Sequence, residues 1–520
     1  MADTDKTACR ILAELLTCHG VSRAVMSPGS RNLPLLIALG RSSKIVTDMV
    51  VDERTAAFAA LGMAVATGKP VALACTSGSA LLNYAPAVAE AYYRHIPLII
   101  VSADRPAEWI DQDDSQTIRQ AGALANIVKR SYDIPDNCTT PVAMWYANRQ
   151  INDALIEAQR GCRGPVHINI QLSEPLNRLT DEPLPAEAMR MIEMPQAHPC
   201  IDDSRLDELR YAMASSDKTM VIAGFMQPDP MLAEALTRIA AMPNVAVLTE
   251  SISNQHVDGA IECIDLTVSG IHDDMIDSYR PDTVITLGGA LVSRYIKQLL
   301  RNHPPRRHWH VGHTPVTVDC LQSLTMRIDM NPADLFARLS STIITDKAAE
   351  SSYRALWQSL YARRIARRNR IVAALPWCDL AAFSEILPRI PAHCDLQLSN
   401  GTPIRYAQLL ADLTSVNRAD CNRGVSGIDG STSTAIGAAM ASGIPTLLIT
   451  GDMSAQYDMG AMALRGVPSS FRMIVIDNGG GGIFRFIAST SGIAERERLF
   501  GDPVNMPVAG LAAAFGWDFH

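Results

Sequence analysis

Oxygen-bearing groups follow two strand-like segments near the C-terminus. Asp452 comes after the apolar run 445–450, and Asn478 and Gly480 come after the apolar run 473–476. Both runs are typical of buried parallel strands, and open α/β sheets bind ligands at the carboxyl ends of such strands. A carboxylate, an amide oxygen and a bared backbone carbonyl are hard oxygen ligands of the kind that Mg²⁺ prefers. This pattern therefore predicts a Mg²⁺ site that holds a diphosphate.

A second charged motif lies near the N-terminus. The strand-like run 50–51 leads through Glu53 into an alanine-rich segment, 55–66, with helical character. A carboxylate at such a junction can point into a cleft, although acidic residues also favour the first turn of any helix because they complement its dipole. If Glu53 and Asp452 serve the same ligand, two separate domains must meet around it.

Two further turns place hydrogen-bond donors after strand-like runs. Residues 76–78 (Thr-Ser-Gly) follow the run 71–75 and open a helical segment, so their amide and hydroxyl groups suit an anionic or polar group. An ordinary helix cap explains this block almost as well. Arg31 ends a tight turn, and a guanidinium there can hold a carboxylate in bidentate fashion. The competing interpretation is a surface arginine after a turn.

Strand-like and helical segments alternate along the chain. With 520 residues it is too long for one hydrophobic core, and its length predicts about three or four domains. Short apolar runs separated by helical lengths predict parallel sheets with helices on both faces. Strands are expected at 24–26, 71–75, 98–101, 166–170, 219–224, 245–248, 283–288 and 308–311, and helices at 55–66, 347–374 and 454–464. The predicted fold class is α/β, with three doubly wound parallel-sheet domains at residues 1–180, 200–345 and 375–520.

Two segments connect these expected domains. The stretch 181–200 contains several prolines without clear periodicity, as a linker does. The helical segment 347–374 carries a run of arginines, and a solvated connector helix is favoured over a polyanion-binding patch because the chain is acidic overall. The chain stops at 515–520, inside or just after a helix, which leaves open whether the third domain is C-terminally incomplete.

Charge, cysteines and hydropathy limit the class of protein. The formal net charge of −8 argues against an extended nucleic-acid surface. The 11 cysteines include no Cys-x-x-Cys pair, so they are expected to be reduced, and a zinc site is not expected. The N-terminal residues show no signal-peptide pattern, and no apolar run approaches the ~20 residues that span a bilayer. A cytoplasmic protein without stable membrane insertion is expected.

Six short motifs occur in the order found in one enzyme family. They are Ser-Pro-Gly-Ser-Arg at 27–31, Asp-Glu-Arg at 52–54, Thr-Ser-Gly-Ser-Ala at 76–80, Ala-Asp-Arg-Pro at 103–106, a glycine-containing block at 423–430 and Asn-Gly-Gly-Gly-Gly-Ile-Phe at 478–484. Asp452 and Asn478 also have the spacing of the thiamine-diphosphate motif. The chain thus resembles the 2-succinyl-5-enolpyruvyl-6-hydroxy-3-cyclohexene-1-carboxylate (SEPHCHC) synthases, thiamine-diphosphate enzymes of menaquinone biosynthesis. The resemblance covers nearly the whole chain and is weakest in the middle.

The resemblance implies a transferase that uses thiamine diphosphate with Mg²⁺ or Mn²⁺. Such an enzyme decarboxylates 2-oxoglutarate and adds the remaining fragment to isochorismate, giving SEPHCHC and CO₂. Glu53 would be the catalytic residue, because a proton shared with the pyrimidine ring favours the imino form that activates the cofactor. Asp452, Asn478 and the Gly480 carbonyl would hold the metal. The domain at 1–180 would bind the pyrimidine and that at 375–520 the diphosphate.

Positions that match the family give the expected binding residues. The cofactor set is Glu53, Thr76, Ser77, Gly78, Gly427, Ile428, Asp452, Met453, Ser454, Asn478, Gly480, Gly481 and Ile483. Both substrates are dicarboxylates, so their site should be rich in fixed positive charge. The substrate set is Arg31, Gln116, Arg294, Asn400, Arg405, Arg423, Phe484 and Ile487. Ile428 would be the apolar wedge that bends the cofactor, although core packing explains it, Phe484 and Ile487 equally well, and Gln116 could be an ordinary loop residue.

The chain departs from the family pattern at three positions and is expected to associate. Gly401 stands where serine is common, Tyr295 where a second basic residue follows Arg294, and Asp477 where the first asparagine of a pair is usual. These changes leave the expected cofactor residues in place. Family members place the cofactor between the first segment of one subunit and the third of another, so the resemblance implies a homodimer or homotetramer.

Three rival functions differ in what the residues would have to do. A thiamine-diphosphate carboligase or decarboxylase acting on pyruvate needs fewer arginines, because its substrate is a monocarboxylate. A nucleotide-binding module or oxidoreductase could use the glycine run 479–482, but the run lacks the spaced Gly-x-Gly-x-x-Gly pattern and an acidic partner downstream. A catalytically silent binding protein is disfavoured because Glu53, Asp452 and Asn478 are all present.

Overall fold

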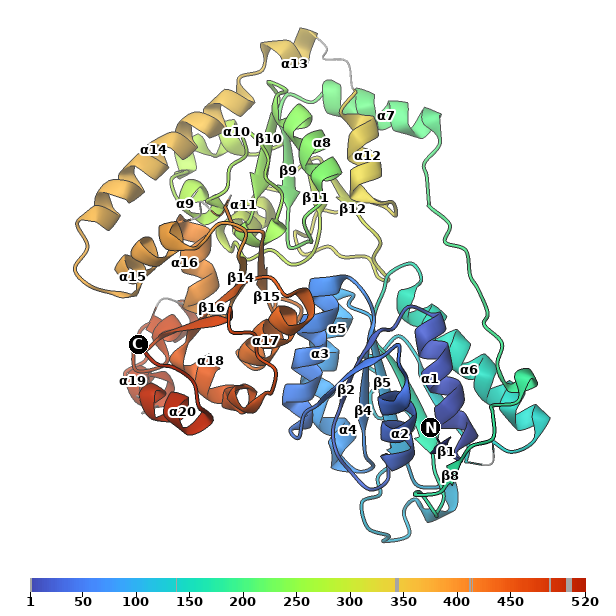
Figure 1. Ribbon diagram of the computed structural model, residues 1–520. Coiled ribbons are helices and arrows are strands. Elements are labelled where there is room, and N and C mark those ends of the chain that lie inside the picture. The colour runs from blue at the N-terminus through green and yellow to red at the C-terminus, as the bar shows by residue number, and fades with distance from the viewer. Residues whose placement is uncertain are drawn as a thin grey trace. The chain divides into compact units, whose positions relative to one another are not determined.

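A computed structural model describes residues 2–136, 138–341, 346–410, 413, 415–485, 488–501 and 507–520 (Figure 1). The chain divides into two compact units, and each is described by itself. Unit 1 contains residues 1–196 and 422–520, and unit 2 contains residues 197–421. Both units are built from parallel strands with helices packed against them, as the alternating sequence pattern predicts.

The N-terminal part of unit 1 is a six-stranded parallel sheet with strand order β3-β2-β4-β5-β7-β6. Its strands are β2 (Arg23–Met26), β3 (Val46–Met49), β4 (Val71–Cys75), β5 (Leu98–Asp104), β6 (Ser131–Ile134) and β7 (Val166–Gln171). Its helices are α1 (Thr7–Cys18), α2 (Leu33–Arg41), α3 (Glu53–Thr67), α4 (Ser79–Asn83), α5 (Ala85–Arg94) and α6 (Pro141–Gln159). A short antiparallel pair, β1 (Asp3–Thr4) with β8 (Leu179–Thr180), accompanies it.

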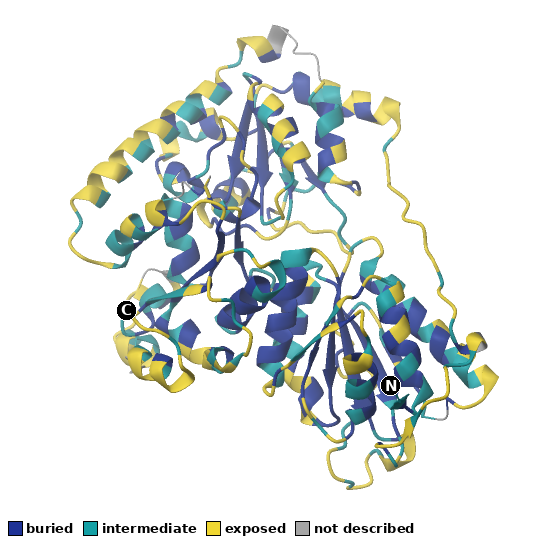
Figure 2. Ribbon diagram, in the orientation of Figure 1, coloured by how far each residue is buried: buried dark blue, intermediate teal, exposed yellow. Residues whose placement is uncertain are grey.

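Alternate residues of these strands pack on opposite faces of the sheet. Ala72 and Ala74 of β4 belong to the core that contains α1, α2 and α6, whereas Leu73 belongs to the core that contains α3 and α5. Since both faces are covered, the strands appear as continuous apolar runs in the sequence. Figure 2 shows these strands coloured as buried. This is the doubly wound arrangement that the sequence predicts.

Unit 2 contains a five-stranded parallel sheet with strand order β10-β9-β11-β12-β13. Its strands are β9 (Thr219–Ala223), β10 (Val245–Thr249), β11 (Thr283–Leu287), β12 (Arg307–Val311) and β13 (Met326–Ile328). Helices α7 (Asp203–Ala214), α8 (Pro230–Ala240) and α12 (Pro332–Leu339) share one core with it, and α9 (Ile264–Val268), α10 (Ile276–Tyr279), α11 (Tyr295–Asn302) and α14 (Tyr353–Ala373) share the other. The four strands expected in this segment are confirmed.

The remaining strands are also parallel. In unit 2, β14 (Asp395–Leu398) pairs with β15 (Arg418–Cys421), accompanied by α13 (Asp346–Glu350), α15 (Asp379–Ile386) and α16 (Thr402–Leu410). In unit 1, β16 (Thr446–Gly451) pairs with β17 (Arg472–Ile476), accompanied by α17 (Ser431–Ser442), α18 (Asp452–Tyr457), α19 (Arg496–Phe500) and α20 (Val508–Phe515). None of the helices within the described residues is both long and apolar enough to cross a bilayer.

Helices α3 and α17 bring the N-terminal and C-terminal parts of unit 1 together. A Cβ atom added at Gly62 would lie 1.9 Å from the Thr434 carbonyl oxygen, and one added at Gly437 would lie 2.0 Å from the Ala59 carbonyl oxygen. The two backbones therefore approach so closely that larger residues would clash at these positions. Residues 55–65 of α3 are buried all round the helix, which explains its alanine-rich composition.

The structure corrects three expected boundaries. The strand expected at 50–51 is β3, which ends at Met49 because β2, its partner in the sheet, ends at Met26. The helix expected at 454–464 stops at Tyr457 and continues as a 3₁₀ turn, Met459–Ala463. The helix expected at 347–374 is two helices, α13 and α14.

Candidate active site

The Asp452 carboxylate accepts hydrogen bonds from two backbone amides at the carboxyl ends of β16 and β17. Its Oδ2 accepts from the Gly480 amide at 2.7 Å and its Oδ1 from the Met453 amide at 2.7 Å. The contact forms because Gly451 and Ile476, which end the two strands, are register partners. Gly481 packs in the same place, where its amide donates to Met453 Sδ at 3.0 Å. The structure thus brings Asp452 and the 478–481 turn together, as the sequence predicts.

The turn after β17 depends on glycine. Gly479, Gly480 and Gly481 have φ angles of 78°, 84° and 60°, a region that L-residues with side chains rarely adopt. A Cβ atom at Gly481 would also lie 1.8 Å from the Phe500 carbonyl oxygen. Asn478 is half-buried at the start of this turn, while Asp477 is exposed. The glycine run is therefore a tight turn that lets the backbone approach Asp452.

The turn before α17, which contains Gly427 and Ile428, is hydrogen-bonded to α18. Ser454 is buried, and its hydroxyl donates to the Ile428 carbonyl at 2.6 Å. Gly430 follows with a φ of 70°, and a Cβ atom there would lie 2.2 Å from the ring of Phe58 on α3. The turn that contains Gly427 and Ile428 is therefore held on one side by α18 and on the other by α3.

Glu53 is the first residue of α3 and is half-buried, although the preceding Val51 is 79% exposed. Asp52 caps the helix by accepting from the Thr55 amide at 3.1 Å. Burial, and then the neighbouring charge of Glu53, raise the pKa of the Cys75 thiol. Burial is also the main reason that the pKa of Tyr84 is raised, with Cys75 and Glu53 adding to the shift. Glu53 thus lies beside a buried, apolar end of β4.

Gly78 follows β4 in a conformation that requires glycine, with a φ of 86°. Its amide donates to Gln120 Oε1 at 2.7 Å, and Gln120 Nε2 donates to the Asn169 Oδ1 at 2.9 Å and to the Ala103 carbonyl at 3.1 Å. A Cβ atom at Gly78 would lie 3.4 Å from the Gln116 carbonyl oxygen. The structure therefore places exposed Gln116 directly against the 76–78 turn. Gln120 was missed by sequence reasoning, although it lies in the same segment as Gln116.

Arg31 is buried, being only 6% exposed, so the interpretation as a surface arginine is wrong. Its guanidinium donates to the Leu172 carbonyl at 2.9 Å and pairs with Glu174 at 3.2 Å. Burial, and then the charge of nearby Arg105, lower the pKa of Arg31. Two guanidinium groups close together favour an anion between or beside them, because the anion offsets the repulsion between their charges. Arg105 was not among the expected substrate residues, although it stands in the 103–106 motif.

The segment that carries Arg423 is tied to α5 by a buried carboxylate. Glu90, which is 1% exposed, accepts from the amides of Gly424 and Val425 at 2.8 and 2.7 Å. Arg94 on the same helix donates to Asn422 Oδ1 at 3.2 Å. Arg423 itself is half-buried. Its position is therefore set by contacts on both sides of it in the chain.

Arg294, Asn400 and Arg405 belong to unit 2. Arg294 is exposed at the turn before α11, Arg405 lies on α16, and Asn400 is buried after β14, where its Oδ1 lies 3.5 Å from Cys421 Sγ. In unit 1, Ile483 and Phe484 are half-buried, and the Phe484 ring packs on Phe500 with centroids 4.9 Å apart. Ile487 lies outside the described residues.

The donor groups present fit thiamine diphosphate and a divalent cation. A carboxylate offers about four lone-pair positions, so the two amide bonds to Asp452 leave others for a cation. Asn478 and Gly480 belong to the turn whose Gly480 amide bonds to Asp452, and they can offer neutral oxygen donors. Near Glu53, the Thr76 hydroxyl is buried and has no hydrogen-bond partner among the described residues, as expected of a group that receives a polar ligand.

Comparison with other proteins identifies the family. Residues 6–123 match the family model of the thiamine pyrophosphate enzyme N-terminal TPP binding domain. The SEPHCHC synthase of Porphyromonas gingivalis is 39% identical over 522 residues, covering 99% of this chain and 90% of the relative. The SEPHCHC synthase of Bacteroides fragilis is 38% identical over 486 residues, covering 92% of this chain and 84% of the relative.

The chain belongs to the SEPHCHC synthase family. The resemblance based on six motifs is thereby confirmed, as are the α/β fold class and the use of thiamine diphosphate by this transferase family.

Two departures from the SEPHCHC synthase pattern, Gly401 and Tyr295, lie in unit 2. Gly401 has a φ of 99°, so a serine there would be strained in this backbone. Tyr295, where a second basic residue is usual in SEPHCHC synthases, is 52% exposed. The ammonium of Lys297, two residues further on, donates to the Leu291 carbonyl at 3.0 Å.

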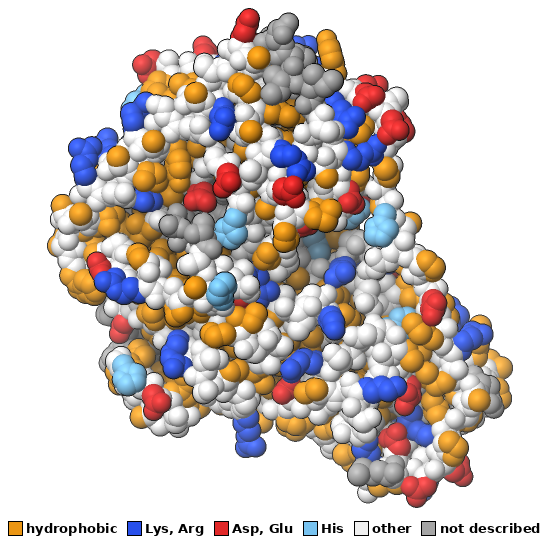
Figure 3. Space-filling view, turned by 45° about the horizontal axis from the view of Figure 1, so that its top comes forward, with side chains coloured by type: hydrophobic (Ala, Val, Ile, Leu, Met, Phe, Trp, Pro, Cys, Tyr) orange, Lys and Arg blue, Asp and Glu red, His pale blue; other side chains and the backbone are white. Residues whose placement is uncertain are grey.

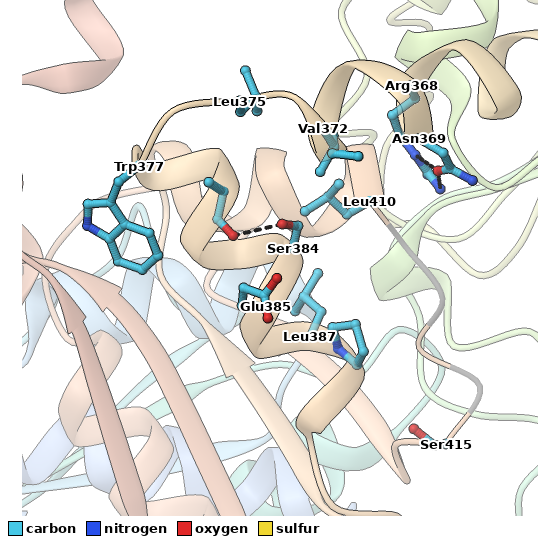
Figure 4. Close-up of a pocket in the computed structure, with 13 residues that line it drawn as sticks. Arg368, Asn369, Val372, Leu375, Trp377, Ser384, Glu385, Leu387, Leu410 and Ser415 are labelled. Carbon is cyan, nitrogen blue, oxygen red and sulfur yellow. Dashed lines mark hydrogen bonds between the residues drawn. The ribbon is translucent and has the colours of Figure 1, made fainter.

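Unit 2 contains a cavity of about 880 Å³ (Figure 4). Trp377, Val372 and Leu387 line it, and Ser384, also at its wall, donates to the Ala381 carbonyl at 2.7 Å. Its lining among the described residues includes no expected site residue. On the face shown in Figure 3, acidic and basic side chains are interspersed, with no single sign dominating.

Proposed function

We propose that this chain decarboxylates 2-oxoglutarate and adds the remaining fragment to isochorismate, giving SEPHCHC and CO₂ in menaquinone biosynthesis. The observation that supports this most is the 39% identity to a SEPHCHC synthase over 99% of the chain. The site agrees with it, because residues expected for cofactor and metal lie in turns held by short hydrogen bonds between backbone and side-chain atoms.

Glu53, Asp452 and Asn478 are proposed to hold and activate the cofactor. Thiamine diphosphate, when bound, supplies the carbanion chemistry that removes CO₂ from a 2-oxo acid and transfers the rest. Asp452, Asn478 and the Gly480 carbonyl would bind Mg²⁺ or Mn²⁺ on the diphosphate. Glu53 would share a proton with the pyrimidine ring and so set its protonation state. Its position at the start of α3, beside the buried end of β4, suits this role.

Fixed positive charge is proposed to orient the two dicarboxylates. Arg31 cannot swing freely, because its guanidinium is buried and bonded to the Leu172 carbonyl. Arg105 adds a second charge beside it. Held in place in this way, the guanidinium groups can align a ring carboxylate without reorganising during the reaction. Arg294, Arg405 and Arg423 are proposed to hold the other carboxylates, and Gln116, Asn400 and Phe484 are proposed to contact the substrates.

The active form is proposed to be a homodimer or homotetramer, with the cofactor bound between subunits. Each subunit is proposed to have domains at 1–180, 200–345 and 375–520 and to lie in the cytoplasm. Val51, two residues before Glu53, and Tyr457, at the end of α18, expose 79% and 52% of their surfaces. The cysteines form no disulfide within the part of the chain that the structure describes, which fits a reducing compartment.

The test is turnover of isochorismate with 2-oxoglutarate, thiamine diphosphate and Mg²⁺, followed by mass detection of the adduct. The control omits thiamine diphosphate. Cofactor-dependent adduct is expected. Loss of CO₂ from 2-oxoglutarate while isochorismate persists would show that isochorismate is not the acceptor. Turnover of pyruvate instead of 2-oxoglutarate would favour a pyruvate-specific carboligase.

A further inference from the structure

A short segment after β10 makes hydrogen bonds to three elements of unit 2. It comprises residues 250–254, here called the junction segment, and most of its side chains are buried. Two of the elements carry arginines of the proposed substrate site, and the third, β15, ends two residues before Arg423. The junction segment itself contains no group that sequence reasoning assigned to the site.

Glu250 holds the turn that carries Arg294. Its two carboxylate oxygens accept from the amides of Val292 and Ser293 at 2.8 and 2.7 Å, and the side chain is 3% exposed. Burial of a carboxylate is costly unless charge-assisted hydrogen bonds compensate it, so this one is matched to the turn. Asp265 supports the same turn, since it accepts from the Ser293 hydroxyl and from the Tyr295 amide at 3.2 Å.

The next residue links the junction segment to the helix that carries Arg405. The Ser251 amide donates to Gln408 Oε1 at 2.7 Å, and Gln408 Nε2 donates to the Glu262 carbonyl at 2.6 Å. Gln408 is buried on α16, one turn after Arg405. The position of α16 along its axis is therefore fixed relative to the junction segment.

Asn254 makes the third link, to β15. Its side chain accepts from the Ala419 amide at 2.8 Å and donates to the Ala419 carbonyl at 2.9 Å, as a neighbouring strand would do. It also donates to the Met226 carbonyl at 2.8 Å. Asn254 has a φ of 53°, which asparagine tolerates better than most residues. Both its backbone and its side chain are thus suited to this position.

We propose that Glu250 and Asn254 are positioning residues that fix the Arg294 turn, α16 and β15 relative to one another, and thereby set the affinity for the dicarboxylate substrates. This inference rests on the proposed function of Arg294. Neither residue is expected to touch substrate or cofactor. Their loss should therefore weaken substrate binding without affecting the binding of thiamine diphosphate, whose proposed residues lie in unit 1.

The first test is Glu250→Gln, which keeps the size of the side chain. It replaces one carboxylate oxygen by an NH₂ group, which cannot accept a hydrogen bond from the Val292 or Ser293 amide. We expect KM for at least one dicarboxylate to rise about 2- to 30-fold, the range found for residues that act through others. We expect kcat and the affinity for thiamine diphosphate to stay within about twofold. Hydrogen exchange of the 292–293 amides should become faster. Unchanged KM, or unchanged exchange, would overturn the inference.

Asn244→Ala is the matched control. Asn244 precedes the same strand at its opposite end, is equally buried, and donates to the carbonyls of Met213 and Ser216. Asn244→Ala should lower the free energy of unfolding about as much as Glu250→Gln does, without changing KM. A rise in KM equal to that of Glu250→Gln would show a general effect of destabilisation and overturn the positioning role.

Asn254→Gly provides a second variant, because glycine keeps the φ of 53° and removes only the side-chain bonds. This variant should also raise KM.

The Arg294→Ala background separates this inference from the proposed function. Glu250→Gln should cause little further rise in KM there, since the group it positions is gone. An undiminished rise would overturn the inference while leaving the function intact. If Arg294→Ala alone left KM unchanged, Arg294 would not be a substrate residue, and both its proposed role and this inference would fail.

Discussion

At the scale of single residues, the most specific expectation concerns Glu53. Glu53→Gln preserves the side-chain size and the start of α3 but removes the carboxylate that would share a proton with the cofactor. Turnover should fall by about 10²–10⁴-fold, the usual contribution of proton transfer. Binding of thiamine diphosphate, measured by fluorescence titration, should be nearly unchanged. Asp52→Asn is the control, because asparagine also caps helices well. Undiminished turnover in Glu53→Gln would exclude the proposed activation.

Asp452 gives a complementary expectation about binding. Asp452→Ala removes the proposed cation ligand and leaves the Gly480 amide without its acceptor. Mg²⁺-dependent binding of thiamine diphosphate should weaken by more than about tenfold, since even residues outside the ligand set of a metal site have effects of 10- to 100-fold. The measurement is a titration of thiamine diphosphate at several Mg²⁺ concentrations. A dissociation constant that stays at the wild-type value would rule out the proposed metal site.

At the scale of elements, the crossing of α3 and α17 controls stability. Gly62→Ala would place a Cβ atom 1.9 Å from the Thr434 carbonyl oxygen, so the helices would have to separate. Overpacking of this kind costs about 1–3 kcal/mol, and the midpoint of urea unfolding should fall accordingly. Gly40→Ala, on α2, is the matched control, because a Cβ atom there has no neighbour within 4 Å. That variant should be neutral or more stable by up to about 1 kcal/mol. Equal effects of the two variants would contradict the close crossing.

Buried histidines in the sheets predict a loss of stability in acid. Burial lowers the pKa of His167 on β7, and of His308 on β12, from 6.5 to about 4. Between these values the unfolded chain binds more protons, so the free energy of unfolding falls as pH drops from about 6.5 to 4. Asp104 and Asp458, whose pKa values burial raises to about 6, act in the opposite direction. The effect of His167 is therefore measured by comparing variant and wild type. The free energy of unfolding of His167→Gln should fall less steeply than that of the wild type as the pH drops from about 6.5 to 4. An identical pH profile would contradict it.

At the scale of the whole molecule, the proposed position of the cofactor between subunits predicts complementation. Glu53→Gln and Asp452→Ala should each have little activity on their own. If each site takes Glu53 from one subunit and Asp452 from its partner, hybrid dimers made by co-expression contain one intact site. Random pairing should then restore about a quarter of the wild-type activity. Subunits that each build a complete site would give no restoration, and this outcome would reject the shared site.

The sequence was sufficient to predict the types of residues in the candidate site and the positions of most strands. Asp452 and Asn478 could be placed together because each follows an apolar run, and parallel neighbouring strands end at the same edge of a sheet. The two-sided burial of the sheets was likewise visible as continuous apolar runs. The edge strand β3 was misplaced, since pairing on one side with a short β2 gives no such run.

What only the tertiary structure decided is which side chains support these groups. The burial of Arg31, the bond from Gly78 to Gln120 and the bonds of Glu250 to the Arg294 turn join residues far apart in the chain. Local spacing does not encode such contacts, because they depend on how the backbone between the partners is routed. A buried glutamate or glutamine looks like any polar loop residue until the amides that it must satisfy are placed around it. The sequence therefore determined the chemistry and the family of this protein, and the fold determined how that chemistry is held in place.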